Sequence, residues 1–492
     1  MPHSILDENI LESGYGVESK PLLQLETFEI TTTWRKKLRK IWEGIRPSIL
    51  TPTSPIQEMQ PLRRTAYLDG LRGFAALIVY CGHHQLWARD VIGAGAILEN
   101  SWGYENRWYF ACLPGIRLFF SGGHLAVTIF FVISGYVLSA KPLSYIQSAE
   151  YLKLQDNIGS ALFRRWLRLY IPVICTTFIY MTSWHLFGIW TASPEHKKTY
   201  AEELWNYYIE FKNFSFVFRG SGNDWLTYNF HVWSIPVEFR GSIIIYTVLA
   251  AFSRCTVSAR LWCTVGLIFY FMYITDGAHY AMFLTGMILC DLDLLSLKGN
   301  LPNFFHIFSP HKKVICYTLF IIGIYLGGVP SFKQEYEILQ ESPGWRWLSV
   351  FKPQAVFDYK WFYLYWASLF MVFTIPRIST LKRFFEWRFC QYLGKISFAF
   401  YLVHGPVLWI LGDRLYVAAG WSREVHGGAL PGWINLFPLS KAGPLGLELS
   451  FLLPHIIILP VTLWLAEIVT RYIDEPSVRF SQWLYRLTQS TP

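Results

Sequence analysis

Four ionisable residues lie within one apolar stretch, residues 68–88: Asp69, Arg72, His83 and His84. Ionisable groups inside a membrane segment are energetically costly and usually serve a function. Arg72 and His83 are eleven residues apart. That is close to three helical turns, so they share one helix face to within about 20° and lie roughly 16 Å apart along the axis. This helix would present a cation near one membrane surface and a titratable imidazole past the midplane.

Asp69 and His84 occupy other positions on the same helix. Asp69 lies one turn before Arg72 and can hold the guanidinium in place. His84 is turned by about 100° from the shared face. We therefore prefer His83 as the reactive imidazole and expect His84 to line the cavity. The alternative is structural: Arg72 would reach to the lipid headgroups, and His83 would be a hydrogen-bonded packing residue.

The segment that begins at His231 supplies a carboxylate. Glu238 follows His231 by seven residues, so the two nearly share a helix face, and we expect His231 to line the cavity. The segment enters the membrane from the side opposite to the start of the first helix, which puts Glu238 about 10 Å in and near the depth of His83. A carboxylate there can orient an imidazole or stabilise its protonated form. Alternatively, Glu238 pairs with Arg240 or Arg72 and is structural.

Two further segments offer polar groups to the same cavity. His404 lies midway along residues 396–412, beside a Gly-Pro kink. It either packs structurally or lines the cavity with His83. Ser134 precedes a glycine, a pair that permits close helix packing. Ser134 is expected to line the cavity, but because no GxSxG motif surrounds it we do not assign it as a nucleophile.

A basic cluster precedes the third apolar segment. Arg165 and Arg168 lie one turn apart and could clamp a phosphate bidentately. Such a clamp would suit a phosphorylated donor in the cytosol. The alternative is an ordinary cluster of positive charge on the cytosolic side of a membrane protein.

The composition indicates a polytopic membrane protein. Of 492 residues, 53% are hydrophobic and 16% are charged, whereas soluble proteins carry about a quarter charged residues. With cytosolic N- and C-termini, the basic clusters of the short loops all fall on one side of the membrane. The net charge of +9 is thereby explained without a nucleic-acid partner. We predict an all-α fold of about ten transmembrane helices, at residues 68–88, 120–139, 167–189, 231–252, 261–275, 278–293, 313–329, 361–376, 396–412 and 447–470.

Three regions follow from these segments. Residues 1–60 are expected to form a cytosolic polar tail, with a basic amphipathic patch at 34–46 that could lie on an anionic membrane surface. Residues 66–480 would form the transmembrane domain, and residues 481–492 a cytosolic tail. Asn213 begins an Asn-Phe-Ser triplet in a predicted lumenal loop and is a candidate glycosylation site.

Several motifs together resemble the acyltransferase-3 family of membrane-bound O-acyltransferases, in its fungal form. The resemblance runs from about residue 66 to 480. It rests on Tyr67-Leu-Asp-Gly-Leu-Arg-Gly-Phe-Ala-Ala followed by His83, on Phe130-Phe-Val-Ile-Ser-Gly-Tyr, Arg164-Arg-Trp-Leu-Arg-Leu-Tyr-Ile-Pro, Trp233-Ser-Ile-Pro-Val-Glu238, Phe283-Leu-Thr-Gly-Met and Leu393-Gly-Lys-Ile-Ser-Phe-Ala-Phe-Tyr-Leu-Val-His404.

The resemblance implies ten spanning helices, a cytosolic acyl-CoA donor and an essential histidine in the first helix, which is His83 here. It also implies a basic Arg-x-x-Arg near the third helix, matched by Arg165 and Arg168. We expect Arg72 to join these two arginines at the donor phosphates. His83 would act as general base or transient acyl carrier, Glu238 would orient it, and Asp69 would fix Arg72.

The expected reaction moves an acyl group, which we take to be acetyl, from acyl-CoA to a hydroxyl of a small-molecule natural product. A cell-wall polysaccharide or a lipid is the alternative acceptor. A proton-coupled transporter with the same buried groups is the alternative of another class, and a non-catalytic membrane scaffold is a third. We expect a multi-pass protein of an endomembrane or the plasma membrane, with no bound cofactor, no metal and no obligate protein partner.

Overall fold

The computed structural model describes residues 62–218 and 225–489. Within these ranges the secondary structure is helical, with no strand. Contacts divide the chain into residues 1–64 and 65–492, and only the second unit is described below. The predicted amphipathic patch at 34–46 lies outside the described residues.

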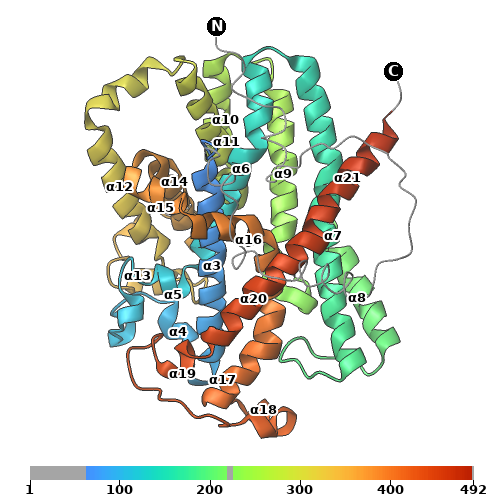
Figure 1. Cartoon of the computed structure of the whole chain (residues 1–492). Helices are drawn as coiled ribbons and strands as arrows, with labels where there is room; N and C mark the ends of the chain where they lie inside the picture. The colour runs from blue at the N-terminus through green and yellow to red at the C-terminus, as the bar shows by residue number, and fades with distance from the viewer. Residues whose placement is uncertain (1–61, 219–224, 490–492) are drawn as a thin grey trace. The chain divides into compact units, whose positions relative to one another are not determined.

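Each of the ten predicted segments coincides with a long helix, as their hydropathy requires. The long helices are α3 (Ala66–Ala88), α6 (Gly123–Gln147), α7 (Tyr151–Phe187), α9 (Ser234–Ala251), α10 (Val257–Tyr273), α11 (Ala278–Leu297), α12 (Lys312–Gly327), α14 (Lys360–Thr374), α16 (Arg388–Val407) and α20 (His455–Val469) (Figure 1).

Shorter helical pieces occupy the connections. They are η2 (Asp90–Ile92), α4 (Gly95–Leu98), η3 (Tyr104–Asn106), η4 (Phe110–Cys112), α5 (Leu118–Ser121), α8 (Tyr200–Phe214), η5 (Thr227–Trp233), η6 (Asn303–His311), α13 (Tyr336–Glu341), η7 (Leu348–Phe351), η8 (Ile375–Arg377), α15 (Ser379–Phe385), the π turn η9 (Leu408–Gly412), α17 (Asp413–Ala419), α18 (Glu424–Ala429), η10 (Pro431–Trp433), α19 (Leu449–Leu452), the π turn η11 (Thr470–Asp474) and α21 (Glu475–Thr488).

By length and composition, six of the described helices could cross a membrane. The bent pair α14 and α15, with an angle of 97°, would be a seventh. The helices α3 and α7 fall outside this set because their ionisable residues lower their hydropathy, and α10 has only 17 residues. A membrane protein is therefore supported, whereas ten spans and cytosolic termini remain predictions.

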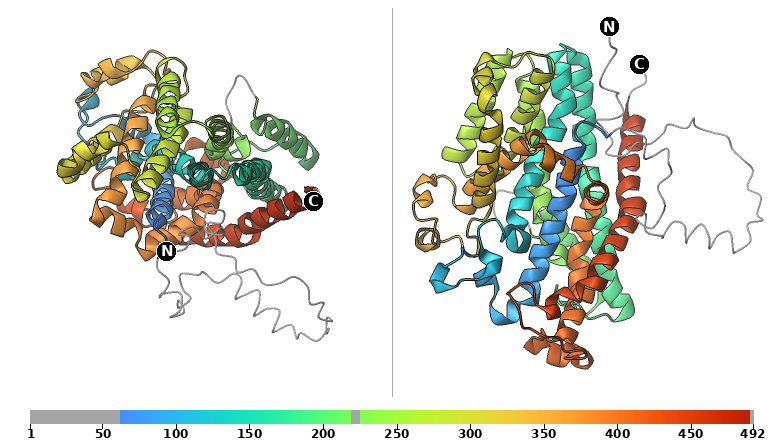
Figure 2. Two further views of the ribbon diagram at one scale, coloured as in Figure 1. Left: turned by 90° about the horizontal axis from the view of Figure 1, so that it is seen from above. Right: turned by 60° about the vertical axis from the view of Figure 1, so that its left-hand side comes forward.

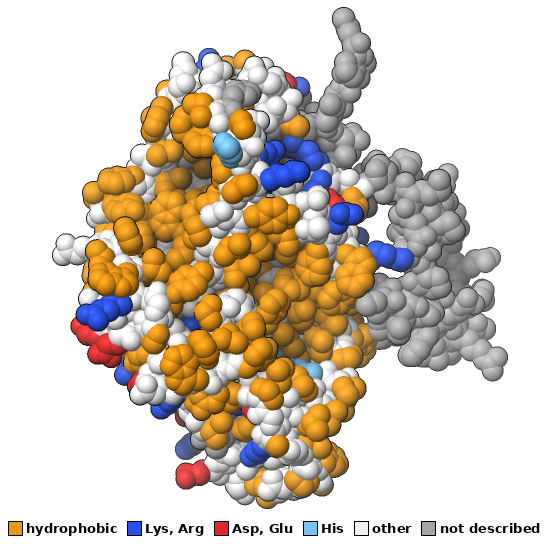
Figure 3. All heavy atoms as spheres, turned by 90° about the vertical axis from the view of Figure 1, so that its left-hand side faces the viewer, with side chains coloured by type: hydrophobic (Ala, Val, Ile, Leu, Met, Phe, Trp, Pro, Cys, Tyr) orange, Lys and Arg blue, Asp and Glu red, His pale blue; other side chains and the backbone are white. Residues whose placement is uncertain are grey.

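Exposed apolar side chains gather on the outside of the helices. On α12, Val314 is 67% exposed and Ile321 is 64% exposed, and on α20 Ile456 is 69% exposed. Figure 3 shows one face of the molecule covered largely by such hydrophobic side chains. An apolar surface of this extent is costly in water and suits contact with lipid tails.

The helices around α3 pack with their backbones in near contact. A side chain added at Gly73 of α3 would meet the backbone nitrogen of Gly394 in α16 at 2.2 Å. One added at Gly286 of α11 would meet the carbonyl oxygen of Val132 in α6 at 2.0 Å. Small residues at such crossings let helices approach closely where no water can drive association. These glycines hold α3 against α16 and α6 against α11.

Helical structure extends beyond the predicted segments in several places. The helix α7 begins at Tyr151 rather than near 167, so its arginines lie inside the helix. At the other end of the chain, α21 continues to Thr488, so residues 481–488 of the predicted tail are helical. The helices α20 and α21 run beside α16 and α7 respectively (Figure 1, Figure 2).

Candidate active site

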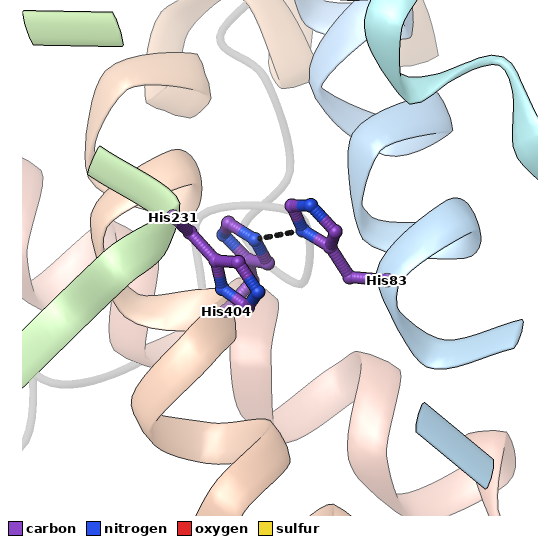
Figure 4. A group of neighbouring side chains, drawn as sticks. All are labelled: His83, His231 and His404. Carbon is purple, nitrogen blue, oxygen red and sulfur yellow. Dashed lines mark hydrogen bonds between the residues drawn. The ribbon is translucent and has the colours of Figure 1, made fainter. Parts of the chain in front are cut away.

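Three histidines from three separate elements meet in the interior of the helix bundle. His83 comes from α3, His231 from η5 and His404 from α16 (Figure 4). His83 Nδ1 lies 2.8 Å from His404 Nε2, within hydrogen-bond distance. The ring of His231 stacks on that of His83 with centroids 3.8 Å apart. His231 is 5% exposed and His404 is 1% exposed, so both are buried, whereas His83 is only half-buried. Of the three rings, His83 is therefore the one a substrate can best reach.

The hydrogen bonds of this cluster define the tautomers of His83 and His404. His404 Nδ1 lies 2.7 Å from the carbonyl oxygen of Tyr401, which can only accept, so Nδ1 carries the proton. In the neutral ring His404 Nε2 is then an acceptor, and His83 Nδ1 must be the donor to it. The lone pair of His83 consequently lies on Nε2. This is the arrangement of a general base whose orientation is held by a second group.

The position of His231 depends on a backbone hydrogen bond that α16 lacks. Pro406 has no N–H, so the carbonyl oxygen of Leu402, four residues earlier, loses its helical donor. Asn229 Nδ2 donates to that oxygen at 2.9 Å. The hydroxyl of Tyr401 donates to the carbonyl oxygen of His231. These two bonds dock η5 onto α16 and bring His231 beside the other rings.

Gly405 makes this docking possible. A Cβ atom at Gly405 would lie 2.7 Å from His231 Nδ1, 3.0 Å from Trp409 and 3.1 Å from Asn229 Oδ1. A side chain larger than hydrogen would therefore push η5 away from α16. The Gly-Pro pair thus frees a carbonyl that receives Asn229 and leaves space for the imidazole of His231.

The three imidazoles are also close enough to consider as metal ligands, since their nitrogens lie within 4.8 Å of one another. Their ring planes, however, are nearly parallel, at 5° between His83 and His404 and 10° between His83 and His231. Stacked rings direct their lone pairs into parallel planes, so His83 and His231 could converge on one ion only after a ring rotation. The geometry favours a hydrogen-bonded pair with a stacked third ring.

Glu238 does not make the contact that the sequence predicts. Its carboxylate accepts hydrogen bonds from Arg165 and from the hydroxyl of Ser134. Arg165 Nε also donates to Ser242 Oγ at 2.7 Å. The group that hydrogen-bonds to His83 is His404, so the expected orientation of His83 by Glu238 is corrected. Among the described contacts, the arginine paired with Glu238 is Arg165 of α7, whereas the alternative named Arg240 or Arg72.

A charged cluster surrounds the other end of α3. Arg72 Nη2 lies 3.4 Å from Asp69 Oδ1, as expected, and donates to the carbonyl oxygen of Gly394 at 3.1 Å. Asp474, in the π turn η11, interacts electrostatically with both Arg72 and Arg168. Arg72 and Arg168, which are far apart in the sequence, therefore lie close enough to interact with one carboxylate.

His84 faces a different set of side chains. Its Nδ1 lies 2.7 Å from the hydroxyl of Tyr416. That hydroxyl is 3.1 Å from His455 Nε2, and His455 Nδ1 is 2.7 Å from the hydroxyl of Tyr80. These groups link α3 to α17 and α20. His84 is fully buried in this network, which gives it a structural partner separate from the rings around His83.

The candidate glycosylation site is accessible. Asn213 is exposed in the last turn of α8. The exposure meets one requirement for a glycan, and modification of Asn213 stays a prediction.

Three residues of the site were not predicted from the sequence: Asn229, Tyr401 and Asp474. The sequence does contain an indication for Asn229. A proline inside a helix leaves one carbonyl oxygen without its helical donor, so a polar side chain is expected to donate to it. Tyr401 and Asp474 had no such indication, since their roles depend on which helices lie side by side. His404 and His231 were named as cavity-lining residues, and the structure brings both of them to His83.

Comparison with known proteins identifies the family. Residues 65–466 match the acyltransferase domain of the acyltransferase-3 family. An O-acetyltransferase of Phomopsis amygdali, PaAT-1, is 28% identical over 490 residues, covering 90% of this chain and 88% of the relative. The acyltransferase clz18 of Cochliobolus lunatus is 22% identical, covering 88% of this chain and 97% of the relative.

A third relative, the acyltransferase R4 of a Phoma species, is 22% identical and covers 87% of this chain and 97% of the relative. No solved structure matches the chain. These relatives are acyltransferases, and none of the three names describes a transporter or a scaffold. The chain therefore belongs to the acyltransferase-3 family and is an acyltransferase of the fungal type.

Proposed function

We propose that this protein transfers an acetyl group from cytosolic acetyl-CoA to a hydroxyl of a small-molecule natural product. The observation that carries the proposal is the hydrogen bond between His83 and His404, which leaves His83 Nε2 as a free base on a half-buried ring. The acetyl group is favoured because one relative is named an O-acetyltransferase.

The donor binds at the arginine end of α3. Arg72 and Arg168 both interact electrostatically with Asp474, and Arg165, one turn before Arg168 on α7, pairs with Glu238. Arginines suit the phosphates of coenzyme A because their planar guanidinium groups bind them bidentately. Arg72 and His83 are roughly 16 Å apart along α3, a span that the extended pantetheine arm can bridge.

The chemistry takes place at His83. Its Nε2 accepts the proton of the acceptor hydroxyl while the hydroxyl oxygen attacks the thioester carbonyl carbon. The C–S bond then breaks, and the imidazolium returns its proton to the departing thiolate. His404 holds the His83 ring in the required tautomer, and the stacked His231 ring fixes its plane. Glu238 positions Arg165 rather than His83.

The acceptor is a small molecule in this proposal. A cell-wall polysaccharide or a lipid is the alternative, and a direct comparison of extracted products decides between them. Acetylated material in the polymer fraction of a cell expressing the protein would favour the polysaccharide.

The proposal is tested by incubating purified protein with radiolabelled acetyl-CoA. We expect His83→Ala to lower label release and transfer by about 10³-fold, the size of a general-base contribution, with its affinity for acetyl-CoA retained. The neighbouring His84→Ala is the matched control. It removes an imidazole from the same helix and should keep kcat within about twofold, because its partners belong to a separate network. Full transfer by folded His83→Ala would remove the assignment.

A further inference from the structure

A second feature of the molecule lies outside the residues discussed so far. A cavity of about 330 Å³ is present in the connections that follow α3 and α12. The short helix α5, in the first of these connections, packs against the C-terminal half of α3, the half that carries His83. The cavity is lined by Ser101, Trp102, Trp108, Cys112, Pro114, Arg117, Tyr325, Gly328, Pro343, Gly344 and Trp345.

Aromatic rings form two of its walls. Trp102 and Trp108 meet edge to face with centroids 4.6 Å apart. Tyr325 stacks on Trp345 at 5.2 Å with an angle of 16° between the rings. Trp345 is only 3% exposed, whereas Trp102 and Trp108 are 37% and 59% exposed. One aromatic pair thus lies deep in the cavity and the other at its rim. Ring faces of this kind bind flat apolar groups.

The cavity also contains a few polar groups. Arg117 is 3% exposed and donates to the carbonyl oxygens of Asn100, at 2.7 Å, and Leu98, at 3.4 Å. Burial raises the pKa of the nearby Glu99 carboxyl to about 7, so this carboxyl does not fully cancel the Arg117 charge at neutral pH. Ser101 Oγ is buried without a hydrogen-bond partner in the described part of the chain. A ligand oxygen could form a hydrogen bond with this hydroxyl, close to the positive charge of Arg117.

A smaller cavity lies next to this one, on the side of His124. Its volume is about 10 Å³, with room for roughly one water molecule, and it shares Arg117 with the larger cavity and is also lined by His124. His124 lies close enough to His83 to interact with it electrostatically. The larger cavity is therefore separated from His83 by Arg117 and His124.

We propose that this cavity binds the hydroxyl acceptor and that the acceptor is a flat aromatic or polycyclic molecule. The inference rests on the proposed function and specifies its substrate class. The volume lies at the lower limit of small-ligand sites, which are largely apolar with a few placed polar groups. A sugar would need hydrogen-bond partners around its whole ring, and Ser101 and Arg117 are too few.

The test measures binding rather than turnover. The probe is 2-naphthol, a flat molecule with one hydroxyl, titrated into the purified full-length protein by isothermal calorimetry. Trp108→Ala should weaken the Kd about tenfold, the scale of a lost aromatic contact, and Trp108→Phe should lose less. Trp347→Ala is the matched control, because Trp347 is 84% exposed and does not line the cavity; its Kd should equal that of the wild type.

His83→Ala should also bind 2-naphthol with the wild-type Kd, so failure of the acetyl-transfer assay and failure of this inference can be told apart. The inference is overturned by a wild type that does not bind 2-naphthol, or by equal Kd values for Trp108→Ala and the wild type. Tighter binding of methyl β-glucoside than of 2-naphthol would show a sugar site instead and would likewise overturn it.

Discussion

The two ends of α3 hold their polar groups in different ways. At the His83 end, the hydrogen bonds of the cluster go to another imidazole and to backbone carbonyls. At the Arg72 end, each arginine has a carboxylate neighbour: Asp69 and Asp474 for Arg72, and Asp474 for Arg168. An imidazole can be neutral and needs no counter-ion, whereas a guanidinium always carries its charge.

This difference suits two separate tasks. A neutral ring held by dipoles can gain a proton and lose it again in one catalytic cycle. A cluster of paired arginines keeps its charge and can exchange a carboxylate partner for a phosphate. Changes at the histidine end should therefore alter kcat, and changes at the arginine end should alter the KM for acetyl-CoA.

Of the changes considered at the two ends of α3, removing the hydrogen-bond partner of His83 should have the largest effect on kcat. His404→Leu deletes the acceptor that fixes the His83 tautomer, and we expect kcat to fall by about 100-fold with the Kd for acetyl-CoA unchanged. His404→Gln is the control, since its side-chain oxygen can still accept from His83 Nδ1 and should restore part of kcat. Steady-state kinetics and donor binding on both variants are the measurements. Wild-type kcat in His404→Leu would contradict the role given to His404.

A change at the arginine end should separate binding from chemistry. Arg168→Gln removes one of the guanidinium groups near Asp474. We expect KM for acetyl-CoA to rise by about 10- to 30-fold, as for a lost charge-assisted hydrogen bond, while kcat changes little. The control is Lys153→Gln on the same helix, an equal change of charge at an exposed position paired with Glu150. A fall in kcat at unchanged KM would contradict the assignment of donor binding to the arginine end and of chemistry to the histidine end.

Crowding the histidine cluster should give a smaller effect. Gly405→Ala places a methyl group 2.7 Å from His231 Nδ1, and overpacking of this kind costs about 1–3 kcal/mol. We expect a lower Tm and a kcat reduced severalfold, because the stacked ring must move. Gly427→Ala is the control, as nothing lies within 4 Å of a Cβ there. Equal Tm and kcat in the two variants would show that His231 has more freedom than its packing indicates.

The long helices, and the positions of residues along one helix, could be predicted from the sequence because they depend only on neighbouring residues in the chain. Long apolar runs indicated the helices, and helical geometry placed Arg72 and His83 on one face of a single helix. The pairing of Asp69 with Arg72 followed from a spacing of three residues and is present. Each of these inferences concerns one helix and needs no knowledge of its neighbours.

The contacts between helices could not be predicted in the same way. The depth of Glu238 was inferred from its distance along the chain, but depth does not define the rotation of a helix about its axis. In the structure that rotation turns Glu238 toward Arg165 and Ser134. His231 reaches His83 because η5 departs from regular helix at Asn229, whose φ and ψ are −162° and 84°.

The tautomer of His83 can be measured directly. Protein labelled with ¹⁵N at both histidine ring nitrogens and reconstituted in lipid would be studied by solid-state NMR, with His83→Gln used to assign the His83 signals. The geometry predicts a protonated Nδ1 and an unprotonated Nε2 on His83, coupled through a hydrogen bond to an unprotonated Nε2 on His404. A proton on Nε2 of neutral His83 would contradict the account, because no base would then face the acceptor hydroxyl.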